Sequence, residues 1–148
     1  MSEIAQLESI EHIPEEHLEQ ITAIAKMCHE TNRAYLLVIR ESAKPWEQLD
    51  QQDKDSTIEQ VAFYILNEGA DVSAWHDAWT AKMIVAGWKY GPKRSIKNKT
   101  HECLKPFHHL PEKQQVKDAL FHSVVSQAIH VEIEEVDDDI EIHQELVS

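Results

Sequence analysis

The sequence has little glycine and no long apolar run, and both absences narrow the class of protein. Only three of its 148 residues are glycine, which favours helices over turn-rich β structure. No apolar segment approaches the roughly 18 residues needed to span a bilayer. Met1–Ile4 opens without the basic and apolar regions of a signal peptide. The chain is therefore expected to be one cytoplasmic domain with no membrane partner.

Cysteine and basic charge are also scarce. The two cysteines, Cys28 and Cys103, stand among apolar residues and are expected to be free thiols in a reducing compartment. A net charge of −13 argues against binding to a nucleic-acid duplex, which needs a broad basic surface. Residues 131–148 hold eight acids and no Lys or Arg. They are predicted to form a solvated, partly disordered acidic tail, with a partner-docking arm as the alternative.

Against this acidic background, one segment contains no acid at all. From Ala78 to His101 there is neither Asp nor Glu, and six cations stand there: Lys82, Lys89, Lys93, Arg94, Lys97 and Lys99. Aromatic residues and cations alternate between its two glycines, in Gly87-Trp88-Lys89-Tyr90-Gly91. Aromatic faces and cations suit a small, planar, anionic ligand. We expect Tyr90 near the pocket, Trp88 as a buried anchor, and Lys93 and Arg94 on phosphates, with solvated loop charges as the alternative.

Apolar periodicity predicts a mainly α fold. Helices are expected over residues 13–40 and 50–67, over a third segment that Asp71 or Ser73 caps and that ends at Gly87, and from Leu110 to about residue 130. Residues 88–105 have no helical period, and a short β-hairpin or an extended loop is expected there.

The sequence also contains an internal repeat. Cys28-His29-Glu30 is matched by Trp75-His76-Asp77, and residues 44–50 are matched by residues 105–111, each beginning with Lys-Pro. The sequence therefore predicts a single domain over residues 1–130, made of a degenerate first helix–loop–helix half (13–70) and a second half (71–130).

These motifs carry a resemblance. The segment from about Ser73 to Ala128 resembles the ryanodine-receptor repeat (RyR) domain, which also occurs in bacterial and phage proteins. The matching motifs are His76-Asp77-Ala78-Trp79, Gly87 to Arg94, Lys99 to Phe107, and Leu110-Pro111-Glu112-Lys113. The first half is similar to the partner half of phage members. Three positions depart from the pattern: Ser95-Ile96 replace an acid, Glu102 replaces a proline, and Asn32 stands in the place that corresponds to Trp79.

The resemblance implies a helical fold of paired repeats about a pseudo-twofold, and no catalysis and no cofactor. In the receptor, the tryptophan of the helix motif lines a site for adenine nucleotides. We therefore expect the ligand site in the cleft between the halves, with Trp79 and Arg94 on one side and Asn32 and Arg33 on the other. Core packing is the alternative for Trp79, and pairing with Glu30 is the alternative for Arg33.

For His76 and His29, a structural bond to a backbone carbonyl across the pseudo-twofold is favoured over ligand binding, although His76 stays among the ligand-binding candidates. The expected function is therefore non-enzymatic binding of a nucleotide or nucleotide-derived signal. A phage sponge that sequesters an immune messenger in the host cytoplasm is one form of it. A structural or protein-interaction module is the alternative, and a homo-oligomer is left open.

The residue pattern does not favour a metal site or a catalytic thiol. His101, Cys103, His108 and His109 are ligand types that zinc accepts. However, no spacing resembles a paired-cysteine zinc site, and the family pattern already accounts for His101 and Cys103. A nucleophilic cysteine needs an electropositive, exposed setting and a placed base, and the sequence shows neither. No metal site and no catalytic residue are expected.

Overall fold

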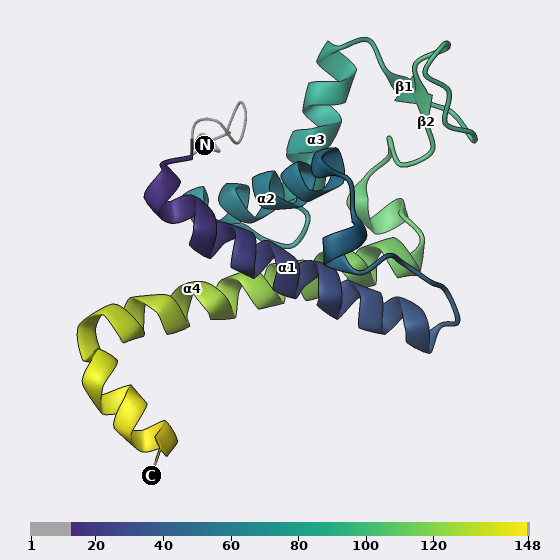
Figure 1. Ribbon diagram of the computed structural model, residues 1–148. Coiled ribbons are helices and arrows are strands. Elements are labelled where there is room, and N and C mark those ends of the chain that lie inside the picture. Colours follow the sequence, from purple (N-terminus) through teal and green to yellow (C-terminus); the bar gives the residue numbers. More distant parts are fainter. Residues whose placement is uncertain (1–12, 148) are drawn as a thin grey trace. The chain divides into compact units, whose positions relative to one another are not determined.

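The computed structural model describes the backbone of residues 13–147 and the side chains of residues 13–130. Its elements are the helices α1 (Glu15–Val38), α2 (Gln51–Leu66), α3 (Ala74–Val85) and α4 (Glu112–Val147), the 3-10 helices η2 (Trp46–Gln48) and η3 (Phe107–His109), and the strands β1 (Lys89–Tyr90) and β2 (Thr100–His101) (Figure 1). The predicted mainly α class is confirmed. The chain forms two compact units. Unit 1 comprises the residues up to Glu68 together with those from Leu120, and unit 2 comprises Gly69–Ala119.

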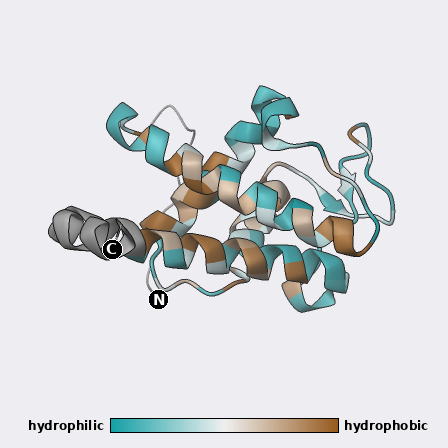
Figure 2. Ribbon diagram, turned by 60° about the horizontal axis from the view of Figure 1, so that its bottom comes forward, coloured by the Kyte–Doolittle hydropathy of each residue, from teal (hydrophilic) through white to brown (hydrophobic). Residues whose placement is uncertain are grey.

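The helices of unit 1 form where the apolar period predicts them. Pro14 precedes α1, and Glu15 and Glu16 lie in its first turn, where acids favour the positive end of the helix dipole. Asp50 caps α2 by accepting a hydrogen bond from the Asp53 N–H. Brown and teal alternate along the helices, as expected where each helix buries one face (Figure 2).

The core of unit 1 is closely packed. Ile24 and Cys28 of α1, Val61 of α2 and Val125 of α4 are its most deeply buried side chains. The Cys28 thiol donates to the Phe121 carbonyl oxygen across 3.8 Å. Burial raises the pKa of this thiol to about 12, so Cys28 stays protonated at neutral pH. Its part is packing in the core of unit 1.

Two helix ends differ from the predictions. Ser73 precedes α3, but within the described residues its side chain caps no helix N–H. Instead the Asp71 carboxylate accepts from the Ser73 N–H and hydroxyl, closing the turn just before the helix. α4 continues to Val147, past the expected end near residue 130. Side chains beyond residue 130 lie outside the described part, so the role of the acidic tail stays a prediction.

The two strands of unit 2 do not form the hairpin that was one of two expectations for this segment. β1 and β2 pair in parallel, with Lys89 opposite Thr100 and Tyr90 opposite His101. A hairpin would pair them antiparallel. One reversal of direction lies between Ser95 and Thr100, which exchange two backbone hydrogen bonds, and Lys99 within it adopts a φ of 52°, which is uncommon for a non-glycine residue. The chain therefore turns within residues 91–99 and re-enters alongside β1 in the same direction.

Gly91 makes this pairing close. A Cβ atom added to Gly91 would lie 2.6 Å from the Thr100 Cβ and 3.0 Å from its Cγ2. Gly91→Ala is therefore expected to force the strands apart and lower the free energy of unfolding by about 1–3 kcal/mol. Urea denaturation followed by circular dichroism measures this. The exposed neighbour supplies the control, since Pro92→Ala should change stability far less. Equal stability of the Gly91→Ala variant and the parent would contradict the close approach.

Candidate functional site

A histidine holds a Lys-Pro turn in each unit. In unit 1, His29 Nε2 lies 2.7 Å from the Lys44 carbonyl oxygen, and in unit 2, His76 Nε2 lies 2.7 Å from that of Lys105. A carbonyl oxygen only accepts, so each Nε2 donates. In both units a 3-10 helix with a buried aromatic residue follows: Trp46 in η2 and Phe107 in η3. We call each His-to-Lys contact with its following aromatic a histidine clamp.

The histidine clamps confirm one expectation and correct another. The predicted structural role, a bond to a backbone carbonyl, is found for His29 and for His76. Each carbonyl, however, belongs to the unit of its own histidine rather than to the opposite half. The physical reason is local: the Lys-Pro turn lies 15 residues beyond His29 and 29 beyond His76, and it folds back onto the helix that carries the histidine.

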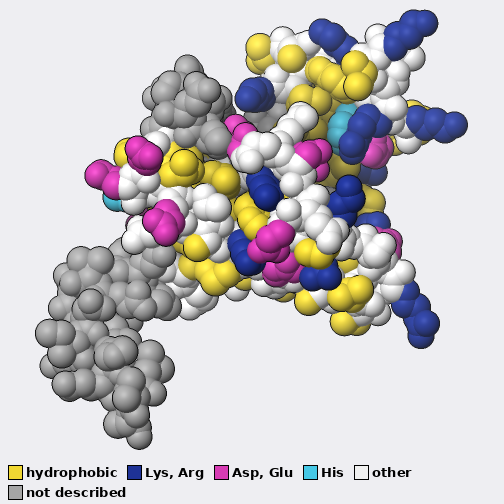
Figure 3. All heavy atoms as spheres, in the orientation of Figure 1, with side chains coloured by type: hydrophobic (Ala, Val, Ile, Leu, Met, Phe, Trp, Pro, Cys, Tyr) yellow, Lys and Arg dark blue, Asp and Glu magenta, His cyan; other side chains and the backbone are white. Residues whose placement is uncertain are grey.

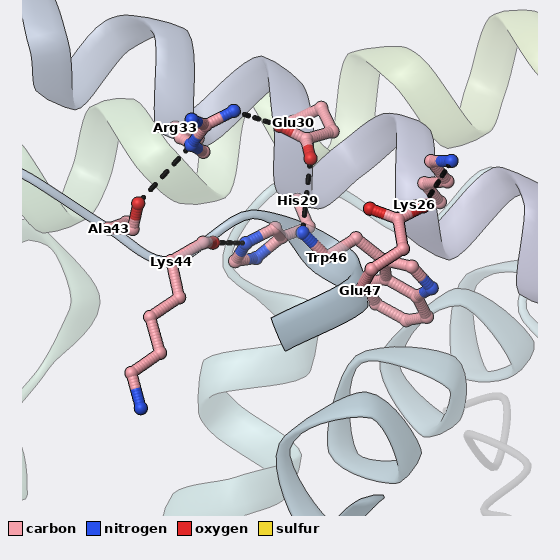
Figure 4. Close-up of polar contacts among 8 residues, drawn as sticks. All are labelled: Lys26, His29, Glu30, Arg33, Ala43, Lys44, Trp46 and Glu47. Carbon is pink, nitrogen blue, oxygen red and sulfur yellow. Dashed lines mark hydrogen bonds and ion pairs between the residues drawn. The ribbon is translucent and has the colours of Figure 1, made fainter. Parts of the chain in front are cut away.

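An acid reinforces the clamp of unit 1. The Glu30 carboxylate accepts from the Trp46 N–H at 3.1 Å and from Arg33 Nη1 at 3.0 Å, while Arg33 Nε donates to the Ala43 carbonyl oxygen (Figure 4). The Trp46 N–H, and after it Arg33, lower the pKa of Glu30. The alternative raised for Arg33, pairing with Glu30, is therefore confirmed. Its guanidinium ties α1 to the turn that precedes η2.

Asn32 is the second predicted site residue in unit 1. Its side chain is half-buried, and Oδ1 is buried without a hydrogen-bond partner among the described residues. Leaving a buried acceptor unsatisfied costs about 1–3 kcal/mol. Such an atom calls for a donor, which keeps Asn32 a candidate for ligand binding. The predicted place of Asn32 and Arg33 beside Trp79 stays a prediction.

In unit 2, Trp79 lies among histidines. Its ring centroid is 5.6 Å from that of His76 and 4.9 Å from that of His101, the latter in an edge-to-face arrangement. The indole is half-buried, so part of it packs in unit 2 and part faces solvent. This position suits both roles predicted for Trp79, which are packing in the core and stacking against a ligand ring.

His101 is the most constrained of these side chains. It is 9% exposed, and Nδ1 accepts the Cys103 N–H at 3.0 Å, so the neutral ring carries its proton on Nε2. Burial lowers the pKa of His101, and the nearby Arg94 charge lowers it further. The ring is therefore neutral at physiological pH.

Arg94 is paired rather than free. Its Nη2 donates to Glu102 Oε1 at 3.1 Å, with the two side chains 61% and 42% exposed. The Glu102 N–H and, less strongly, Arg94 hold the pKa of the Glu102 carboxyl below its usual range. An anionic ligand at Arg94 must therefore compete with Glu102. Glu102 was not among the predicted site residues, although its position as the first acid after the acid-free segment was a usable signal.

The remaining predicted residues line the outside of unit 2. Tyr90 is 54% exposed, and Lys105 Nζ lies 5.8 Å from its ring centroid, within cation–π range. Lys93 is exposed, and its carbonyl oxygen accepts from the Thr100 hydroxyl. Trp88, expected to be buried, is only half-buried. Figure 3, in the orientation of Figure 1, shows Lys and Arg side chains projecting around the β1–β2 segment.

A known protein family matches part of the chain. Residues 67–130 match the RyR domain family, and the chain therefore carries a RyR domain over that range. The match confirms the resemblance derived from the residues between Ser73 and Ala128, and it covers less than half of the 148 residues. It includes the clamp of His76 and every site residue described in unit 2.

No helix in the described part of the chain is long and apolar enough to cross a bilayer.

Proposed function

We propose that the RyR domain binds a small anionic ligand that carries an aromatic ring, of the nucleotide class, and does so without catalysis. One observation carries the proposal. Within unit 2, contacts run from the half-buried Trp79 through His101 to Glu102 and the exposed Arg94. A ring-stacking surface and a guanidinium are thereby held on one small framework. The RyR family match supports the same ligand class, since the resemblance implies an adenine-nucleotide site at Trp79.

Base stacking and phosphate contacts at these residues contribute enough free energy for specific binding. Stacking of a base on an aromatic side chain contributes about 1–3 kcal/mol. Arg94 can bind a phosphate through two parallel hydrogen bonds, and Lys93 can add a point charge. Tyr90 offers a second exposed ring. His76 is engaged with Lys105, so its part in this proposal is to orient the helix that carries Trp79.

The proposal also covers the origin of the two halves and the kind of signal that the protein binds. In it, the two helix–loop–helix halves derive from one repeat, as the paired histidine clamps support, and they retain the pseudo-twofold of the family with Asn32 in the counterpart place of Trp79. A protein of this kind can sequester a nucleotide-derived signal. If the chain is phage-encoded, that signal is a host immune messenger in the host cytoplasm.

Mass spectrometry of small molecules released from the purified protein tests the ligand class directly. It is combined with thermal-shift measurements over a panel of adenine nucleotides and cyclic nucleotides. We expect a nucleotide-class molecule to be released, or a member of the panel to raise the melting temperature. The Lys97→Ala variant, which alters an exposed loop charge, should respond like the parent. No released nucleotide and no shift across the panel would overturn the proposal.

A second candidate function is docking of a host or phage protein. Exposed apolar side chains in unit 2 favour it: Val85 is 89% exposed, Ile96 82% and Ile84 60%. Isolated apolar residues on a surface are ordinary, but several beside a basic loop suit a protein contact. This function predicts a stoichiometric partner in pull-downs that the Val85→Ser/Ile96→Ser variant loses, with no nucleotide bound. A partner retained by that variant would count against this surface.

A further inference from the structure

Three consecutive residues of unit 2 bring different metal ligands together. His101, Glu102 and Cys103 each offer one ligand atom, and these atoms all lie within 4.8 Å of one another. We propose that His101, Glu102 and Cys103 bind a Zn²⁺ ion. The sequence argued against zinc, because no spacing resembles a paired-cysteine site and the family pattern already accounts for His101 and Cys103. The fold adds Glu102, whose carboxylate lies beside the other two ligand atoms.

The backbone holds this segment in a fixed turn. His101 pairs with Tyr90 in the sheet, the Leu104 N–H donates to the His101 carbonyl oxygen at 3.3 Å, and the Lys105 N–H donates to that of Cys103 at 2.9 Å. The ligands therefore stand on an ordered framework before any ion binds. The ion would replace one existing contact, the Cys103 N–H on His101 Nδ1. Such preorganisation reduces the entropy lost on binding.

The Glu102 carboxylate supports the zinc site independently of the grouping of the three ligand atoms. Its Oε2 is buried and has no hydrogen-bond partner among the described residues, and it lies 3.7 Å from His101 Nδ1. Its other oxygen, Oε1, is held by Arg94. A buried, unsatisfied carboxylate oxygen calls for a cation or donor. Carboxylates that bind metals are commonly fixed in this way, with one oxygen on a neighbouring hydrogen-bond donor.

The chemistry of the donors selects the metal. Imidazole nitrogen, carboxylate oxygen and thiolate sulfur together suit Zn²⁺, whereas Mg²⁺ and Ca²⁺ prefer oxygen alone. The Cys103 N–H on Nδ1 places the proton of the His101 ring on Nε2, so Nδ1 keeps a lone pair that a metal can take. Cys103 binds Zn²⁺ as the thiolate, so its proton is released when the ion binds. Three protein ligands leave the fourth tetrahedral position to water.

Titration of the chelator-treated full chain with Co²⁺ tests the site, because Co²⁺ bound by a thiolate absorbs through sulfur-to-metal charge transfer. We expect this absorbance to saturate at one Co²⁺ per chain and to disappear when Zn²⁺ is added. Cys103→Ser should abolish it, while Glu102→Gln and His101→Gln should weaken binding by about tenfold or more. Cys28→Ser and His109→Gln are the matched controls, and both should keep the absorbance of the parent.

A second measurement needs no variant. Zn²⁺ should protect Cys103 from alkylation in the parent protein, as mapped by mass spectrometry, and should leave the reactivity of Cys28 unchanged. Absence of the charge-transfer band, its persistence in Cys103→Ser, or equal alkylation of Cys103 with and without Zn²⁺ would overturn the zinc site. None of these readouts depends on the nucleotide, so the two proposals can fail separately.

Discussion

Phe107→Ala is expected to lower the free energy of unfolding by about 3–5 kcal/mol, since truncating a buried aromatic side chain leaves a cavity. Phe107 is 5% exposed, and its ring centroid lies 6.3 Å from that of His76. It therefore packs beside the histidine that holds the Lys-Pro turn. Loss of the ring therefore removes the packing of η3 and also loosens the histidine clamp of unit 2. A loss of this size is a large part of the stability of a small domain.

Urea denaturation followed by circular dichroism measures this loss. The adjacent His108→Ala variant is the matched control, because His108 lies in the same 3-10 helix and is exposed. It should change stability by far less. Trp46→Ala should cost a similar amount in unit 1, where Trp46 is 6% exposed in η2. A loss below about 1 kcal/mol for both Phe107→Ala and Trp46→Ala would mean that the clamps do not stabilise the units.

Changes at the Arg94–Glu102 pair are expected to move ligand affinity in opposite directions. Arg94→Ala should weaken binding of a phosphate-bearing ligand by about tenfold or more, because it removes a charge-assisted contact. Glu102→Gln should strengthen binding by roughly twofold to fivefold, since exposed ion pairs of this kind contribute little and the competing carboxylate is gone. Competition binding with a fluorescent adenine nucleotide measures both.

Salt dependence provides a check on this prediction. The affinities of the parent and of Glu102→Gln should converge as ionic strength rises, because salt screens the exposed Arg94 charge. Lys97→Ala, a change of charge in the same loop, should have a smaller effect than Arg94→Ala. A weaker affinity in Glu102→Gln would show that Glu102 contacts the ligand directly instead of competing with it.

Much of the fold could be predicted because it depends on local signals. The Pro14-Glu15-Glu16 start and the Asp50 cap place α1 and α2 within about two residues of the predicted bounds. The repeated His and Lys-Pro motifs indicated the structural role of both histidines. The prediction that each histidine bonds a carbonyl of the opposite half was wrong, because sequence spacing does not tell which turn folds back onto which helix.

The strand pairing and the site partners depended on contacts that no local pattern encodes. A glycine-proline step between two extended segments predicts a hairpin, yet the chain also reverses between Ser95 and Thr100, and β1 and β2 pair in parallel. Likewise, Arg94 was identified from the composition of its segment, but its pairing with Glu102 across eight positions follows from the turn that carries both. The RyR pattern supplied the role expected of Trp79, which its helical spacing alone left open.

Calorimetric titration of the nucleotide panel into the parent and the Trp79→Ala variant tests the central claim most directly. We predict saturable binding of at least one nucleotide to the parent at one ligand per RyR domain, weakened in Trp79→Ala by an amount that corresponds to about 1–3 kcal/mol. The variant should keep the helical circular dichroism of the parent. Absence of saturable binding to the parent, or equal affinity in a folded Trp79→Ala variant, would contradict the claim that this RyR domain binds its ligand on Trp79.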